Sequence, residues 1–115
     1  MAAAAVKRFT LIFYAPPTSV QACKAAIFAA GAGRYPGPGN YTECCWSTVG
    51  TGQFRPGAEA NPHIGSAGGA LEETPEVRVE TLCVGEDVVK GVVEALKKAH
   101  PYEEPAYHVI KLEDY

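Results

Sequence analysis

The 115-residue sequence lacks the features that mark nucleic-acid-binding and membrane-spanning proteins. Its ten basic residues are scattered, with Lys7-Arg8 and Lys97-Lys98 as the only adjacent pairs, and thirteen acidic residues bring the net charge to -3. Phosphate binding needs clustered Lys and Arg, so this composition argues against a nucleic-acid partner. No apolar run approaches the ~20 residues that cross a bilayer, which argues against a membrane partner.

The sequence also shows no secretion signal. Residues 1–6 are too short for the apolar core of a signal peptide, and the basic residues Lys7 and Arg8 follow them rather than precede them. We therefore expect a cytoplasmic protein. Residues 1–5 are predicted as a loose tail on a single domain that covers residues 1–115.

The four cysteines contain no C-x-x-C pair, so the usual zinc or redox spacing is missing. Without a secretory signal, all four are expected to be reduced thiols. Cys23 falls on the apolar stripe of a predicted helix and Cys83 on one face of a predicted strand. Both are therefore interpreted as small core residues.

Apolar periodicity predicts a first strand-helix-strand unit. Residues 7–15 alternate with a period of two, which is typical of a strand with one apolar face. Thr18 to Gln21 has the form of a capping box, and the alanine-rich helix that follows is expected to stop at Gly31 and Gly33. A second strand is predicted over Tyr41 to Val49, after a glycine- and proline-rich loop.

A second unit of the same kind occupies the C-terminal third. A strand is predicted over residues 76–84, and a helix with an apolar stripe begins at Gly85-Glu86-Asp87. Pro101 ends this helix and pushes His100 out of helical geometry, and the last strand covers residues 106–112. Between the two units, residues 50–56 are interpreted as a hairpin or bulge. Residues 57–70 are predicted as an ordered loop or short irregular strands, held by backbone contacts rather than by a core.

Two strand-helix-strand units commonly make a ferredoxin-like α+β sandwich, in which two helices cover one face of an antiparallel sheet. The open face of such a sheet must be covered, and oligomerisation is a common solution. Three aromatic residues outside the predicted core are candidates for that interface, namely Tyr41, Trp46 and Tyr107.

Three motifs stand out along the chain: Gly50-x-Gly52-x-Phe54-x-Pro56, Asn61-Pro62-x-x-Gly65 and the octet His100-Pro101-Tyr102-Glu103-Glu104-Pro105-Ala106-Tyr107. Together with Gly31-Ala32-Gly33 and Gly39-Asn40-Tyr41, they resemble the YqfO-type insert domain of the Nif-three-like family. The resemblance runs from about Lys7 to Leu112. It implies a domain like those of the PII and CutA group, whose ferredoxin-like subunits tend to form trimers.

The longer bacterial members of this family often carry a GTP cyclohydrolase type-2 label and hold the module between two halves of a metal-binding domain. Their His- and Glu-rich dinuclear site has no counterpart among the three separated histidines of this chain. The resemblance therefore does not carry a hydrolase or cyclohydrolase activity over to it. Residues 34–38 also look like a short insertion in the first glycine loop, which weakens any binding role transferred to that loop.

The loop motifs predict ligand-binding clefts. The acidic turn Tyr102-Glu103-Glu104 is interpreted either as a cation or acid/base site or as a rigid structural turn. Gly50 to Arg55 is interpreted either as an anion cradle or as a tight turn that needs positive φ. The predicted ligand-binding residues are Gly50, Gly52, Phe54, Arg55, Pro62, His63, His100, Tyr102, Glu103 and Glu104.

A divalent metal ion is a possible cofactor of the same region. Its predicted ligands are His63, His100, Glu103 and Glu104. A soft-metal site of Cys44, Cys45 and His63 is a weaker alternative, because neighbouring residues of a strand point to opposite faces.

The leading prediction is a non-catalytic, oligomeric binding or regulatory module, a trimer by the family analogy, for a small ligand or metal ion. It follows from specific glycine- and acid-containing loops that are not accompanied by a complete catalytic constellation. One alternative is a metal-dependent hydrolase with sites at subunit interfaces. Another is a purely structural or partner-docking domain.

Overall fold

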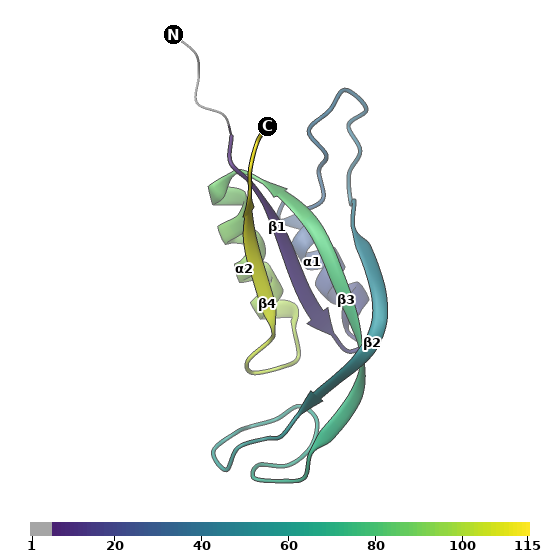
Figure 1. Cartoon of the computed structure of the whole chain (residues 1–115), viewed down its shortest axis with the longest axis vertical. Coiled ribbons are helices and arrows are strands. Elements are labelled where there is room, and N and C mark those ends of the chain that lie inside the picture. The colour runs from purple at the N-terminus through teal and green to yellow at the C-terminus, as the bar shows by residue number, and fades with distance from the viewer. Residues whose placement is uncertain (1–5) are drawn as a thin grey trace.

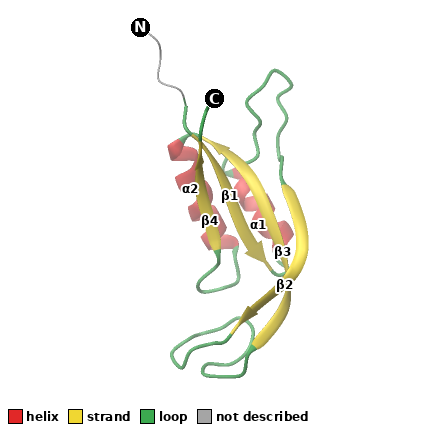
Figure 2. Cartoon of the chain, viewed as in Figure 1, coloured by secondary structure: helices red, strands yellow, loops and turns green. Residues whose placement is uncertain are grey.

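The computed structural model describes residues 6–115, and the predicted loose tail, residues 1–5, lies outside the described residues. Six elements follow one another along the chain: β1 (Arg8–Ala15), α1 (Val20–Ala29), β2 (Trp46–Phe54), β3 (Glu72–Val84), α2 (Glu86–Ala99) and β4 (Tyr107–Leu112). The strands form one antiparallel sheet in the order β2-β3-β1-β4. Both helices pack on the same face of this sheet (Figures 1 and 2), so the predicted ferredoxin-like α+β architecture is confirmed.

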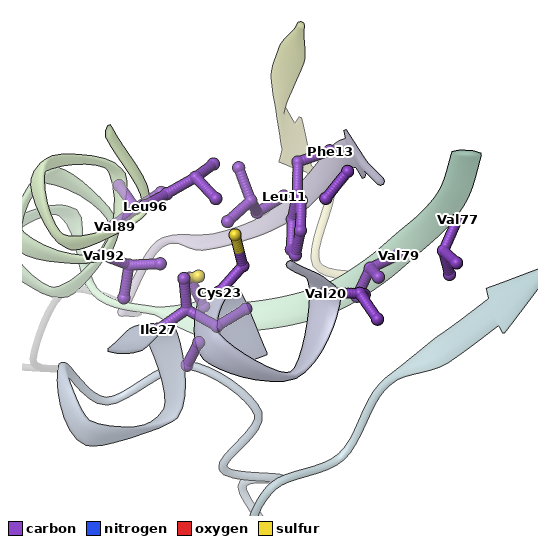
Figure 3. Close-up of a cluster of buried hydrophobic side chains, with 13 residues drawn as sticks. Leu11, Phe13, Val20, Cys23, Ile27, Val77, Val79, Val89, Val92 and Leu96 are labelled. Atoms are coloured by element: carbon purple, nitrogen blue, oxygen red, sulfur yellow. The ribbon is translucent and has the colours of Figure 1, made fainter. Parts of the chain in front are cut away.

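The core lies between this helical layer and the two central strands (Figure 3). Alternate residues of β1 and β3 point into it, including Leu11, Phe13 and Val79, which have no exposed surface. The helices contribute the predicted stripes, with Cys23 and Ile27 from α1 and a matching set from α2 (Val89, Val92 and Leu96). Cys23 and Cys83 are both fully buried, and burial raises the pKa of the Cys83 thiol to about 11, so their prediction as core residues is confirmed.

The predicted capping box before α1 is wrong. The N-cap residue is Ser19 rather than Thr18, and no side chain caps the helix. Instead, the Pro16 carbonyl accepts hydrogen bonds from the amides of Ser19 (2.9 Å) and Val20 (3.1 Å). The turn after Pro16-Pro17 thus satisfies two amides at the start of the helix, but not the Gln21 amide that the Thr18 hydroxyl was expected to bond.

The second strand was predicted too early in the chain, because residues 41–45 lie in a loop and β2 runs from Trp46 to Phe54. A backbone clamp holds this loop beside β3: the Gly33 amide donates to the Leu82 carbonyl (2.8 Å), and the Cys44 amide donates to the Gly33 carbonyl (2.9 Å). The Thr81 hydroxyl also donates to the Cys44 carbonyl (2.8 Å). Gly33 has φ of +74°, a conformation that glycine adopts without strain.

β3 is longer than predicted, because it begins at Glu72 and pairs with β2 as far as Phe54. This β2–β3 ribbon continues past the ends of β1 and β4 and carries the loop of residues 55–71 at its far end (Figure 1). The turn between α2 and β4, residues 100–106, lies next to that loop (Figure 1). The ribbon therefore brings the glycine-rich excursion beside the C-terminal octet.

The open face of the sheet carries only part of the predicted aromatic set. Trp46 is exposed at 59% and Tyr41, in the preceding loop, at 70%. Tyr107 is a correction, since it packs against the core on the helix-covered face, where the Lys97 ammonium lies 5.5 Å from its ring centroid. Within residues 6–115 neither helix has the length and apolar character needed to cross a bilayer.

Candidate functional site

A cavity of about 320 Å³ lies between the end of the β2–β3 ribbon, the loop that follows β2, and the turn that follows α2. Its volume is at the small end of the range for small-molecule sites. Its walls combine apolar, aromatic and charged side chains from these three segments. The lining residues are Gln53, Phe54, Arg55, Pro56, Gly57, Ala60, Pro62, His63, Ile64, Glu76, Tyr102, Glu103, Glu104 and Ala106.

A side chain from the turn holds the loop in place. The Asn61 amide donates a hydrogen bond of 2.9 Å to a carboxylate oxygen of Glu103. The Gly68 amide donates to the Gly57 carbonyl (2.8 Å) and closes the loop on itself, and Pro56 is buried at its start. A loop without apolar periodicity is thus ordered by backbone hydrogen bonds, as the sequence predicts.

Tyr102 forms the centre of the cavity wall. Its ring centroid lies 6.2 Å from that of Phe54, 6.0 Å from that of His63 and 4.9 Å from that of His100. Its hydroxyl oxygen is buried and has no hydrogen-bond partner among the described residues. Burial and, to a smaller extent, the Glu76 carboxylate raise the pKa of Tyr102, so the hydroxyl keeps its proton at neutral pH.

The structure corrects the prediction that His100 is a metal ligand and a ligand-binding residue. It is 6% exposed, and both ring nitrogens are already engaged. Nε2 lies 2.6 Å from the Tyr14 carbonyl, to which it donates, and Nδ1 accepts the Tyr102 amide at 3.1 Å. A histidine with two occupied nitrogens cannot also bind a metal ion, because ligation needs a free lone pair.

Burial lowers the pKa of His100; the hydrogen bond with Tyr14 opposes this shift, and nearby His63 adds to it. The neutral ring therefore links the end of β1 to the turn that positions Tyr102. His100 supports the cavity wall from behind rather than lining the cavity.

The structure also corrects the prediction for Gly50 and Gly52, because these residues form neither an anion cradle nor a tight turn. Both lie within β2, opposite Glu76 and Thr74 respectively, and neither has positive φ. Gly52 instead leaves room for a neighbour, since a Cβ atom there would overlap the Glu76 carboxylate. The missing side chain lets Glu76 lie across β2 and reach the cavity.

The structure brings seven of the ten predicted ligand-binding residues to the cavity, namely Phe54, Arg55, Pro62, His63, Tyr102, Glu103 and Glu104. Sequence reasoning missed Glu76, which was read only as the first residue of a strand. Burial raises the pKa of this carboxyl group. The one signal that could have identified Glu76 was the gap left by Gly52, which becomes visible only once the strand register is known.

The structure does not assemble the proposed metal sets. Within residues 6–115, no group of three or more His, Cys, Asp or Glu side chains is placed to hold a metal ion. Cys44 and Cys45 precede β2, whereas His63 follows it. A nine-residue strand spans roughly 30 Å at ~3.3 Å per residue, so one subunit cannot combine these cysteines with His63.

No family model matches the sequence. The chain is 44% identical over 101 residues to a protein of Mycobacterium leprae named GTP cyclohydrolase 1 type 2 homolog, and the match covers 88% of this chain and 25% of that protein. The protein of the same name from Bacillus subtilis is 41% identical over 103 residues, with 90% of this chain and 26% of that protein covered. The chain thus spans about a quarter of the length of these relatives.

Solved structures give the same picture. A Bacillus cereus protein related to NIF3 superposes with a TM-score of 0.79 at 34% identity, covering 99% of this chain and 28% of that one. The divalent cation tolerance protein CutA of Archaeoglobus fulgidus has a TM-score of 0.64 at 14% identity, covering 94% of this chain and 86% of that one. The Bacillus subtilis GlnK–ATP complex has a TM-score of 0.61 at 12% identity, covering 96% of this chain and 85% of that one. The last two share the fold.

Proposed function

This chain belongs with the segment, about a quarter in length, that it matches in the Nif-three-like proteins, and from that premise we propose that it is a non-catalytic, oligomeric binding module. Its small ligand occupies the cavity around Tyr102. The observation that carries this proposal is the cavity itself, which the Asn61–Glu103 hydrogen bond helps to hold together and which seven of the ten predicted ligand-binding residues line.

The sheet supports the oligomeric part of the proposal. Six of the nine residues of β2 are exposed in succession, starting at Trp46, and β2 forms one edge of the sheet. A long edge strand with free backbone groups is a ready site for pairing between chains. Trp46 and Ile110 add exposed apolar surface on the open face. A trimer, as in the PII and CutA group that the sequence resembles, would cover both.

The cavity also bears on the alternatives. A purely structural docking domain does not need an ordered, charged cavity. A metal-dependent hydrolase would need ligands from more than one subunit, because residues 6–115 of one chain supply no three-ligand group. The proposed function therefore assigns the cavity to binding. From the sequence alone we also propose that the module is cytoplasmic.

A thermal-shift screen of the purified protein tests this proposal. It should contain nucleotides, inorganic anions, amines, amino acids and divalent metals, and native mass and metal content should be measured on the same sample. The expected result is a metal-free trimer that at least one organic ligand class stabilises. His63→Ala should reduce that shift, since His63 lines the cavity, whereas His108→Ala, on a strand outside the cavity, should not.

Two results would overturn the proposal. One is that no class of compound raises the melting temperature. The other is that the two histidine variants respond alike to every ligand that does. A stoichiometric metal in the purified protein would favour the hydrolase alternative instead.

A further inference from the structure

We infer that the cavity binds an organic cation, an alkylammonium or guanidinium group, rather than a phosphate-bearing ligand. This inference rests on the proposed function of the same cavity and adds the chemical class of its ligand. Three observations carry it: the charge balance of the lining, the aromatic wall and the space at Gly52 that the Glu76 side chain occupies.

The lining has a surplus of negative charge. Three carboxylates, those of Glu76, Glu103 and Glu104, face one guanidinium, that of Arg55. The ion pairs found within residues 6–115 join Lys7 to Glu86, Arg8 to Asp114 and Arg78 to Glu80, and include none of these four groups. A phosphate group would enter a site with a net charge of about -2, where like-charge repulsion opposes binding. A cation would be attracted by the same field.

Glu76 contributes most to this argument. It is half-buried, and burial raises the pKa of its carboxyl group. No salt bridge compensates the loss of water around it in the part of the chain that the structure describes. A partly desolvated carboxylate gains more from an incoming cation than an exposed one, because the charge is screened less.

The aromatic wall favours an organic cation over a metal ion. The rings of Phe54 and Tyr102 lie 6.2 Å apart, centroid to centroid, and the faces of such rings attract ammonium and guanidinium groups. A divalent metal would need at least three oxygen or nitrogen ligands, and residues 6–115 bring no such group together.

Gly52 provides a selective way to change this site. A methyl group at position 52 must displace the Glu76 carboxylate, which is the mobile end of a flexible side chain, so the fold can accommodate it. Gly50 lies two residues away on the same face of β2, and a Cβ atom there would meet nothing within 4 Å. Gly52→Ala therefore shifts the Glu76 carboxylate from its present position, and Gly50→Ala is its matched control.

Calorimetric titration of the full chain at low and moderate salt tests the inference. The probes are putrescine, spermidine, agmatine and L-arginine as cations, ATP and inorganic phosphate as anions, and Mg²⁺. We expect at least one organic cation to bind, with an affinity that falls as salt is added. Gly52→Ala and Glu76→Gln should each weaken that binding roughly tenfold, the change expected for loss of one charge-assisted contact, and Gly50→Ala less than twofold.

The outcomes separate this inference from the proposed function. If ATP or phosphate binds and His63→Ala reduces the binding, the cavity is a ligand site but the inferred cation class is wrong. If no probe binds and the broader screen finds no ligand, the proposed function fails as well. If cations bind but the three variants behave alike, Glu76 does not hold the ligand and the inference is overturned. Glu76→Gln keeps the test valid should Gly52→Ala not fold.

Discussion

Replacing His100 with alanine gives the sharpest test of how the cavity wall is supported. The ring is 6% exposed and bonds to the Tyr14 carbonyl at 2.6 Å and to the Tyr102 amide at 3.1 Å. Removing it leaves two polar backbone groups without their partners, at about 1–3 kcal/mol for each group that stays dry. Because both groups are only partly buried and can regain some water, we expect a loss of about 2–4 kcal/mol in the free energy of unfolding.

The assay is urea unfolding at fixed protein concentration, with melting temperature as a second measure. At about 4 °C per kcal/mol, the expected loss corresponds to a melting temperature lower by roughly 8–16 °C. His108→Ala is the control, because His108 is exposed and its ring lies edge-on to that of Tyr14, with 6.3 Å between the centroids. A loss below about 1 kcal/mol, or one equal to that of the control, would refute the supporting role.

The pH dependence of the free energy of unfolding, compared between wild type and His100→Ala, provides a second test. The folded-state pKa of His100 is lowered from 6.5, chiefly by burial, so the unfolded chain binds the proton more readily. The wild type is then most stable above pH 6.5 and loses stability as the pH falls below that value. His100→Ala lacks this titration, and we expect the gap between wild type and variant to narrow on acidification. A constant gap would contradict the reasoning.

Three further predictions concern single groups. Gly33→Ala should destabilise the fold by at least about 2 kcal/mol in urea unfolding, because φ is +74° and the new Cβ would lie 2.8 Å from the Cys44 amide. Gly91→Ala, whose Cβ would point into open space beside α2, should instead stabilise the fold by about 0.5–1 kcal/mol. Equal effects of the two substitutions would argue against the clamp. Glu76→Gln should raise the free energy of unfolding at pH 7, because burial raises the pKa of the carboxyl from 4.5 and so disfavours its charged form. If this gain in stability persists below pH 4.5, its origin is not the charge of Glu76. Tyr102→Phe should leave stability unchanged or raise it by up to about 1 kcal/mol, since the buried hydroxyl lacks a partner, and a loss of more than 1 kcal/mol would reveal a hydrogen bond to that hydroxyl.

The elements that could be predicted from the sequence are those that bury one face. In β1 every second residue from Leu11 to Ala15 belongs to the core, although Ile12 is buried as well. In the part of β3 from Val77 onward buried and half-buried residues alternate, and α2 carries its buried residues at helical spacing. β2 is an edge strand with six exposed residues in succession, so no alternation marks its start or end. Its glycines then favour the interpretation of a turn, and only the register against β3 shows that they lie within a strand.

The composition of the site could be predicted better than its construction. Motif residues such as Phe54, His63 and Tyr102 do line the cavity. What the sequence could not provide was the pairing of distant groups: Asn61 with Glu103, 42 positions apart, and His100 with Tyr14, 86 apart. Such pairs depend on the whole topology, and local patterns do not encode them. For that reason His100 was mistaken for a metal ligand and Glu76 was overlooked.

The separation of these pairs along the chain has a consequence for the order of folding. The β2–β3 ribbon joins segments that are close in sequence, whereas the cavity closes only when the turn after α2 meets the loop after β2. Contacts between distant segments carry the larger loop-closure entropy and tend to form late. We therefore expect the cavity to assemble in the last step of folding and to be among the first parts to open, as amide hydrogen exchange at Asn61 and Tyr102 would register. Ligand binding would then stabilise the last-formed part of the domain against local opening.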